Sequence, residues 1–288
     1  MKISIIIIVV VVLLAYLGTS SYFAAIAMKI PRILLDDSPA SVGLNYEDVL
    51  FPSRIDNITL SGWYIPGGGG DTIIMVSGSV ENRIESDIGV LKMSRDLVGR
   101  GFNILLFDLR GRGESEGKGL MMTHADRDIG GAVDYIKSRN AAAENIGIIG
   151  FSTGAASALI FAGQENIAVV SDSCFANVSE MLVRVGVKER GLPESLVQFF
   201  KPGVLLMART IYGYKRVDPV DIVADISCPI LFIHGEADDL IPVSDAYTLY
   251  EASGNPLDQL WVVPGATHCQ AYNTDPIGYI DEVISFLR

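Results

Sequence analysis

The turn at residues 150–154 constrains the fold of this chain more than any other segment. It has the pattern G-x-S-x-G, centred on Ser152. An apolar run at 146–149 precedes it, and the small residues 155–158 follow it. A tight turn from a strand into a helix lifts the serine hydroxyl above the sheet in a strained backbone conformation, and the glycines avoid collisions inside the turn. The pattern therefore predicts a nucleophilic Ser152 at the end of a buried strand.

Short apolar runs that favour strands alternate with helical patterns along most of the chain. The predicted strands are Tyr46–Phe51, Ile58–Ile65, Thr72–Val76, Phe102–Asp108, Ile146–Phe151, Ile167–Ser171, Ile230–His234 and Gln259–Val263. The predicted helices are Ile84–Arg100, one capped by Thr123 that ends at Lys137, Thr153–Gln164 and Ile277–Leu287. Strands separated by helices form right-handed crossovers, so we expect an α/β fold with a mostly parallel central sheet covered by helices on both faces. The length of residues 32–288 suits one large domain.

Residues 1–31 are dominated by an apolar segment that is long enough to cross a bilayer as a helix. We expect an uncleaved single-pass transmembrane anchor, with the remaining domain outside the cytoplasm. The alternative is a signal peptide that is cleaved at Ala25-Ile26-Ala27, which would leave a secreted protein.

A stretch at residues 176–227 interrupts the alternation, because it holds no clear strand. Two apolar segments within it, Val178–Val187 and Leu196–Met207, have a helical character. A structureless loop of this length is rare inside a domain. We therefore predict a helical insertion that serves as a lid over the carboxyl ends of the strands.

Charge and cysteine content exclude several classes of function. The net charge is −12 with no run of Lys or Arg, which argues against nucleic-acid binding and against electrostatic docking of the folded domain on anionic lipid. The three cysteines, Cys174, Cys228 and Cys269, have no zinc-site spacing, and we expect Cys269 to be a packing residue. No P-loop or dinucleotide-binding fingerprint is present, so no metal or organic cofactor is expected.

A serine nucleophile needs a base within hydrogen-bonding distance and a carboxylate that orients the base. Among the three histidines, His268 follows the last predicted strand and is the expected base, whereas His234 is expected to hold a turn. Three acids are candidates for the carboxylate. They are Asp238, which we favour, Asp239 and, after the preceding strand, Asp172.

Five ordered motifs between residues 46 and 288 resemble the α/β-hydrolase family of serine hydrolases. They are the opening hairpin at 48–66, the D-x-R-G-x-G-x-S loop at 108–115, the turn at 150–154, the H-G-x-x-D-x-x-[VI]-P loop at 234–242 and the P-G-x-x-H loop that ends at His268. The resemblance singles out Asp238 as the acid. It also implies that the 108–115 loop braces the site and has no catalytic role.

The chain departs from the family where Ser77-Gly78 replaces the usual His-Gly before the oxyanion hole. The hole needs backbone N–H groups, one from the residue after the nucleophile and one from this loop. Thr153 is expected to supply the first. Ser79 is expected to supply the second, with Val80 as the alternative.

These residues predict hydrolysis of an ester, thioester or amide through an acyl-enzyme, with esterase or lipase-like activity favoured over peptidase activity. The apolar side chains of the predicted lid suggest a small-molecule or lipid-like acyl substrate. Two alternatives stay open. One is a non-catalytic, membrane-tethered interaction module with the same fold, and the other is an acyltransferase that uses the same three residues.

Overall fold

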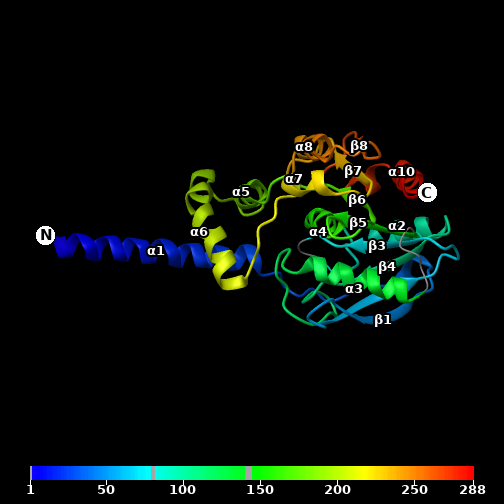
Figure 1. Ribbon diagram of the computed structural model, residues 1–288, viewed down its shortest axis with the longest axis horizontal. Coiled ribbons are helices and arrows are strands. Elements are labelled where there is room, and N and C mark those ends of the chain that lie inside the picture. The colour runs from blue at the N-terminus through cyan, green and yellow to red at the C-terminus, as the bar shows by residue number, and fades with distance from the viewer. Residues whose placement is uncertain (1, 79–81, 140–144) are drawn as a thin grey trace. The chain divides into compact units, whose positions relative to one another are not determined.

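Eight strands form one sheet in the part of the chain that the computed structural model describes, residues 2–78, 82–139 and 145–288 (Figure 1). Their spatial order is β1-β2-β4-β3-β5-β6-β7-β8. The pairs β1–β2 and β2–β4 are antiparallel, and the other neighbouring pairs are parallel. Each predicted strand coincides with one of them. They are β1 (Glu47–Pro52), β2 (Thr59–Ile65), β3 (Thr72–Val76), β4 (Asn103–Phe107), β5 (Ile146–Phe151), β6 (Ala168–Asp172), β7 (Ile230–Gly235) and β8 (Gln259–Val263).

The burial of the strands follows from their positions in the sheet. Every residue of β3, β4, β5 and β7 is buried, as expected for parallel strands that are covered on both faces. The outer strand β1 alternates between exposed and buried residues. The sheet therefore has the mostly parallel, doubly covered form that the sequence predicts.

Helices cover the two faces of this sheet (Figure 1). Helices α2 (Val90–Val98) and α10 (Pro276–Leu287) pack against each other and bury Ile73 and Met75 of β3. Helices α3 (Ala125–Ser138) and α4 (Thr153–Ala162) pack together on the other face. The remaining helical segments of this part are η1 (Pro39–Val42), α7 (Pro219–Ile222), η3 (Val223–Asp225), α8 (Ser244–Ser253) and α9 (Ala271–Thr274).

The predicted cap of α3 is wrong. The helix begins at Ala125, and His124, with a φ of 61°, occupies the capping position. Thr123 instead donates its hydroxyl to the carbonyl oxygen of Met121. A tertiary contact also holds this end of the helix, because Asp128 in the first turn of α3 accepts the backbone N–H and the guanidinium of Arg110.

The strand register brings the carboxyl ends of the central strands to one edge. Val76 of β3 pairs with Gly150 of β5, and Phe151 of β5 pairs with Asp172 of β6. Gly235 ends β7 opposite Val263 at the end of β8. The loops that follow β5, β7 and β8 therefore leave the sheet at the same edge.

Residues 2–29 and 177–216 form a second unit of three helices, α1 (Lys2–Met28), α5 (Val178–Lys188) and α6 (Glu194–Tyr212). In α1, the stretch Ser4–Met28 is long and apolar enough to cross a membrane. Helices α5 and α6 cover the two apolar segments of the predicted insertion, whereas α7 and η3 belong with the sheet. The role of residues 176–227 as a lid stays a prediction.

Candidate active site

Ser152 occupies a strained turn between β5 and α4. Its backbone has a φ of 51° and a ψ of −114°, a conformation that few non-glycine residues adopt. The neighbouring glycines explain how the turn closes. A Cβ atom on Gly150 would lie 2.6 Å from the carbonyl oxygen of Gly154, and one on Gly154 would lie 2.3 Å from that of Val76. The turn therefore requires glycine at both positions.

The structure brings Ser152, His268 and Asp238 together from three separate loops. The Nε2 atom of His268 lies 3.1 Å from the Oγ atom of Ser152. Its Nδ1 atom lies 2.7 Å from the Oδ2 atom of Asp238. The Asp238 side chain is fully buried, whereas 22% of the His268 side chain is exposed. The histidine is thus partly exposed while the carboxylate is shielded from solvent.

The environment of Asp238 fixes the proton arrangement of this group. Burial acts to raise the pKa of Asp238, but hydrogen bonds from His234, His268 and the Ile241 N–H outweigh it and lower the pKa to about 2. The carboxylate is therefore ionised at neutral pH. It accepts the N–H of His268 Nδ1, which leaves Nε2 as the acceptor for the Ser152 hydroxyl proton.

His234 holds the acid loop, as the sequence predicts. Its Nε2 atom lies 2.8 Å from the carbonyl oxygen of Ile241 and 3.3 Å from the Oδ2 atom of Asp238. Both neighbours are acceptors, so Nε2 carries the proton. Burial acts to lower the pKa of His234, but the bond to Asp238 and the Ile241 carbonyl outweigh it, so the pKa is raised. One Asp238 oxygen thus faces two histidines.

The Nδ1 atom of His268 bonds to Asp238 and not to either of the other two candidate acids. Asp239 is exposed on the same loop. Asp172, at the end of β6, is buried and accepts hydrogen bonds from the Ser173 hydroxyl at 2.9 Å and from the Tyr279 hydroxyl at 3.1 Å. Burial raises the pKa of Asp172 to about 6. Among the three acids, Asp238 alone has the geometry of an orienting carboxylate.

One of the two expected oxyanion-hole donors lies in the described part of the chain. The backbone N–H of Thr153 opens α4, at the positive end of the helix dipole and directly after Ser152. Ser79, and its alternative Val80, lie outside the described residues. The residue before them, Gly78, is close to Ser152, since a Cβ atom on Gly78 would lie 3.8 Å from the Cβ atom of Ser152.

Two charged side chains hold Gly78 in place. The Oε1 atom of Glu85 accepts the Gly78 N–H at 2.5 Å, and the Arg112 guanidinium donates to the Gly78 carbonyl oxygen. Arg112 is buried, which lowers its pKa to about 10 and still leaves it charged at neutral pH. The role of Glu85 cannot be predicted from the sequence, because a lone glutamate in a loop has no pattern that marks it.

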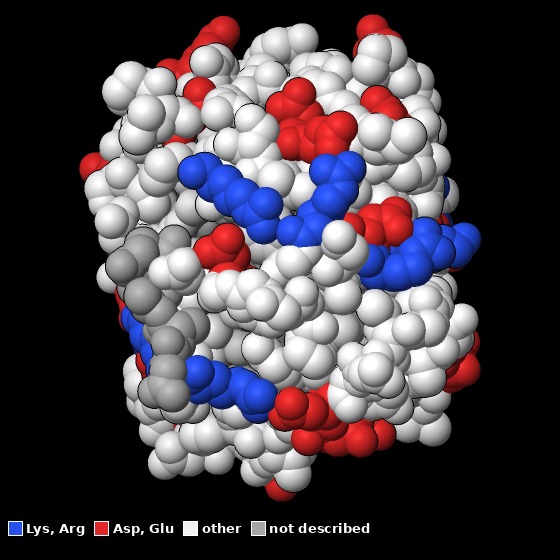
Figure 2. All heavy atoms as spheres, turned by 90° about the vertical axis from the view of Figure 1, so that its right-hand side faces the viewer, with Lys and Arg blue, Asp and Glu red and all other residues white. Residues whose placement is uncertain are grey.

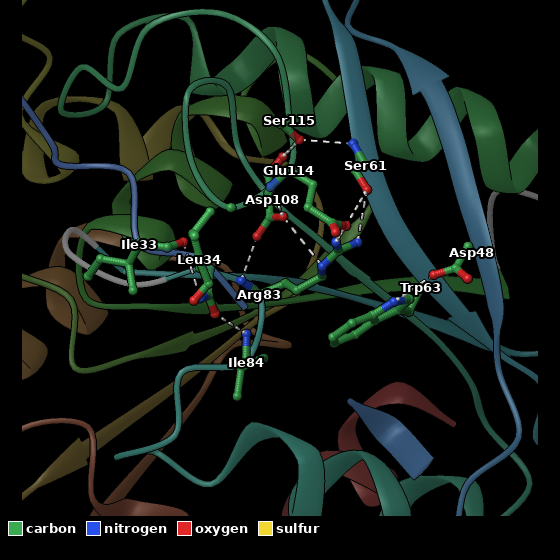
Figure 3. Close-up of polar contacts among 12 residues, drawn as sticks. Ile33, Leu34, Asp48, Ser61, Trp63, Arg83, Ile84, Asp108, Glu114 and Ser115 are labelled. Atoms are coloured by element: carbon green, nitrogen blue, oxygen red, sulfur yellow. Dashed lines mark hydrogen bonds and ion pairs between the residues drawn. The ribbon is translucent and has the colours of Figure 1, made fainter. Parts of the chain in front are cut away.

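A second buried ionic cluster fixes the chain after this loop (Figure 3). The side chains of Arg83 and Asp108 are both fully buried, and the Arg83 Nε atom lies 3.4 Å from Asp108 Oδ2. Arg83 also donates to Glu114, and its guanidinium lies 4.2 Å from the ring centre of Trp63. Asp108 accepts the backbone N–H of Arg83 at 2.8 Å and that of Glu114 at 3.0 Å. The 108–115 loop therefore braces the site, as the resemblance implied.

The cysteines do not compete with Ser152 as nucleophiles. All three are buried, and burial raises the pKa of Cys269 well above its usual value. The backbone N–H of Cys269 donates to the Ser173 hydroxyl at 3.0 Å, which helps to hold the histidine loop. In the described part of the chain, no three His, Cys, Asp or Glu side chains are grouped so that they could hold a metal ion.

Known proteins are similar to this chain in both sequence and structure. The profile of the alpha/beta hydrolase family matches residues 73–282. The Bacillus subtilis protein YqkD is 30% identical over 226 residues, which cover 75% of this chain and 71% of YqkD. YfhR of Escherichia coli K12 is 28% identical over 254 residues, with 84% and 80% of the two chains covered.

A solved structure of the Pyrococcus furiosus esterase Pf2001 superimposes with a TM-score of 0.76 at 28% identity, over 91% of this chain and 97% of that one. The family match spans most of the sheet and all three loops that carry Ser152, Asp238 and His268. The chain belongs to the α/β-hydrolase family.

Proposed function

We propose that the protein is a serine hydrolase that cleaves carboxylic esters through an acyl-enzyme. The observation that carries the proposal is the continuous hydrogen-bonded arrangement of Ser152, His268 and Asp238. The similarity to the Pyrococcus furiosus esterase supports an ester substrate over a peptide.

In the proposed reaction, Ser152 Oγ forms a bond to the ester carbonyl carbon while its proton moves to Nε2 of His268. The ionised Asp238 stabilises the imidazolium that results. The N–H groups of Thr153 and Ser79 bind the oxyanion. When the intermediate collapses, the bond to the alcohol oxygen breaks and His268 returns the proton to it. Water then attacks the acyl-enzyme by the same route and releases the acid.

We also propose that α1 remains attached as a membrane anchor. The packing of α1 against α6 supports retention, because cleavage after Ala27 would remove a helix on which α6 is packed. An anchored hydrolase has direct access to amphipathic esters, so acyl esters of low solubility are the proposed substrate class.

The test is a panel of nitrophenyl esters of increasing acyl length, assayed with the full chain in detergent or nanodiscs. We expect turnover by the parent protein and background rates for Ser152→Ala. Equal rates for the two proteins would contradict the proposal. Matched anilides in the same panel distinguish esterase from amidase activity.

A further inference from the structure

The helix α6 is joined to α1 by an unusual polar contact. The Tyr16 hydroxyl donates to the carbonyl oxygen of Phe199 at 3.1 Å and accepts the N–H of Gly203 at 3.2 Å. In an uninterrupted α-helix those two backbone groups would bond to each other. Pro202 lies in the same turn and has no N–H to donate. A side chain of α1 therefore satisfies the backbone of α6 at this irregular turn.

Close packing surrounds this contact. The Tyr16 ring is stacked on the Phe200 ring with 5.3 Å between ring centres. The Phe23 ring also contacts the Phe200 ring, with 5.5 Å between their centres. A Cβ atom on Gly203 would lie 2.2 Å from the Oγ atom of Ser20, so the helices approach closely only because this residue is glycine. Small residues at the contact are typical of helices that pair inside membranes.

The position of the contact along α1 sets its depth in a bilayer. A helix needs about 20 residues to cross the hydrocarbon core. The apolar stretch of α1 runs from Ser4 to Met28. Every window of about 20 residues within that stretch contains both Tyr16 and Ser20. If α1 crosses the membrane, its contact with Phe199 and Gly203 of α6 lies below the lipid headgroups.

The surface of α6 suits that location. Four large apolar side chains are exposed on it, Leu196 by 36%, Phe199 by 63%, Leu206 by 49% and Ile211 by 55%. Single exposed apolar residues are common, but these four lie on the helix that contacts the membrane-spanning segment. Their exposure to lipid would remove them from water.

The charge of the insertion differs in sign from that of the whole chain. Residues 177–216 contain seven basic and three acidic side chains, a net charge of +4, in a protein of net charge −12. The basic residues are Arg184, Lys188, Arg190, Lys201, Arg209, Lys215 and Arg216, and the acidic ones are Glu180, Glu189 and Glu194. The face of the molecule in Figure 2 differs from this basic segment, because its acidic (red) and basic (blue) side chains are interspersed.

We propose that α6 is a membrane-docking helix that lies beside α1 in an anionic phospholipid bilayer. Phe199 and Leu206 enter the acyl region, and the exposed side chains of Arg209 and Lys215 contact lipid phosphates. Basic residues combined with exposed apolar ones are the features that bind helices to anionic membrane surfaces. The negative net charge of the whole chain does not reveal the positive charge of residues 177–216, because the excess of acidic residues lies outside that segment.

The test uses nitroxide spin labels to measure the location of α6 relative to the bilayer, with the full chain in nanodiscs. Cysteines are introduced one at a time at Phe199, Leu206 and, as a control, Ile277, which is 73% exposed on α10. The three native cysteines are buried and remain unlabelled. Collision with oxygen, which enters lipid, is compared with collision with a water-soluble nickel complex.

In nanodiscs that contain phosphatidylglycerol, we expect the ratio of oxygen to nickel collisions at positions 199 and 206 to exceed that at position 277 several-fold. Equal ratios at all three positions would overturn the proposal. This measurement requires no turnover, so it tests membrane docking by α6 independently of the proposed hydrolase activity.

A charge-reversal pair tests the role of the basic residues. Arg209→Glu with Lys215→Glu is compared with Lys92→Glu and Lys118→Glu, which produce the same change in net charge on exposed residues of the sheet domain. We expect the first pair to lower the collision ratio at position 206 in anionic nanodiscs, and the second pair to leave it unchanged. If both pairs have the same effect, the proposed lipid contacts are wrong.

Discussion

The Nε2 atom of His268 lies 3.1 Å from the hydroxyl oxygen of Ser152, although 116 positions separate the two residues in the chain. The distance results from the parallel sheet, which brings the loops after β5 and β8 to one edge. The Ser152 turn is strained and braced by glycines, so its hydroxyl is held in place before any substrate binds. This relationship is the basis of the proposed reaction.

Replacement of Asp238 by Asn should lower kcat by about 10⁴-fold, because the amide no longer stabilises the imidazolium or fixes its tautomer. The Oδ1 atom, which accepts the N–H groups of Leu240 and Ile241, is retained by Asn, so the loop should remain folded. Steady-state kinetics on a nitrophenyl ester measure the effect. Asp239→Asn, at an exposed position, is the matched control and should leave kcat nearly unchanged. The opposite pattern would assign the acid to Asp239.

Glu85→Leu should lower kcat by about 10- to 100-fold, since it removes the acceptor that holds the Gly78 N–H beside the nucleophile. KM should change less than kcat, because the loop acts on the transition state. Glu85→Gln keeps an acceptor oxygen and should retain most of the activity. If Leu and Gln have the same effect, the hydrogen bond to Gly78 does not position the loop.

Asp172→Asn should flatten the dependence of stability on pH between about pH 4 and pH 6. The pKa of Asp172 is raised to about 6 by burial, against about 3.9 in an unfolded chain. The folded protein therefore binds more protons than the unfolded chain in this window, and its stability falls as the pH rises. The loss is at most about 3 kcal/mol.

Melting temperatures at pH 4.5 and pH 7.5 measure the effect for the parent and for Asp172→Asn. The variant should gain stability relative to the parent at the higher pH, while Asn still accepts the hydroxyl of Ser173. A parent and variant with the same slope would show that the ionisation of Asp172 does not contribute to it.

Gly203→Ala should loosen α6 from α1, because the added methyl group collides with Ser20. Gly18→Ala is the matched control, since a Cβ atom there has no neighbour within 4 Å in the described residues. Both changes raise helix propensity by the same amount, about 1 kcal/mol, so only the collision separates them. Limited proteolysis in nanodiscs should cut the loop around Gly191 faster in Gly203→Ala alone. Equal rates for both variants would contradict the observed packing.

The sheet and the loops of the candidate site could be predicted because their signals are local. Short apolar runs mark each strand, and Ser152, Asp238 and His268 each lie in the loop or turn that follows one. The contacts that fix Gly78 could not be predicted in the same way. Glu85 and Arg112 reach it from different segments, and their roles depend on burial that a linear pattern does not reveal.

The pairing of α1 with α6 also lies beyond a sequence pattern. Tyr16 and Phe199 are 183 positions apart. The sequence predicts an apolar helical segment around each residue, but nothing in it predicts that the two segments pair. A local capping rule places the helix cap at Thr123, whereas α3 begins at Ala125 with His124 at the capping position. The ion pair between Asp128 in its first turn and Arg110 has no local sequence signal either.

Labelling of the full chain with a fluorophosphonate probe, alongside Ser152→Ala, tests the central claim most directly. The probe forms a bond to the oxygen of an activated serine. Since His268 accepts the proton of Ser152, the account predicts rapid labelling of the parent protein, none of Ser152→Ala and far slower labelling of Asp238→Asn. A folded parent protein that is not labelled, or a Ser152→Ala variant that is labelled as fast as the parent, would contradict the assignment of Ser152 as the nucleophile.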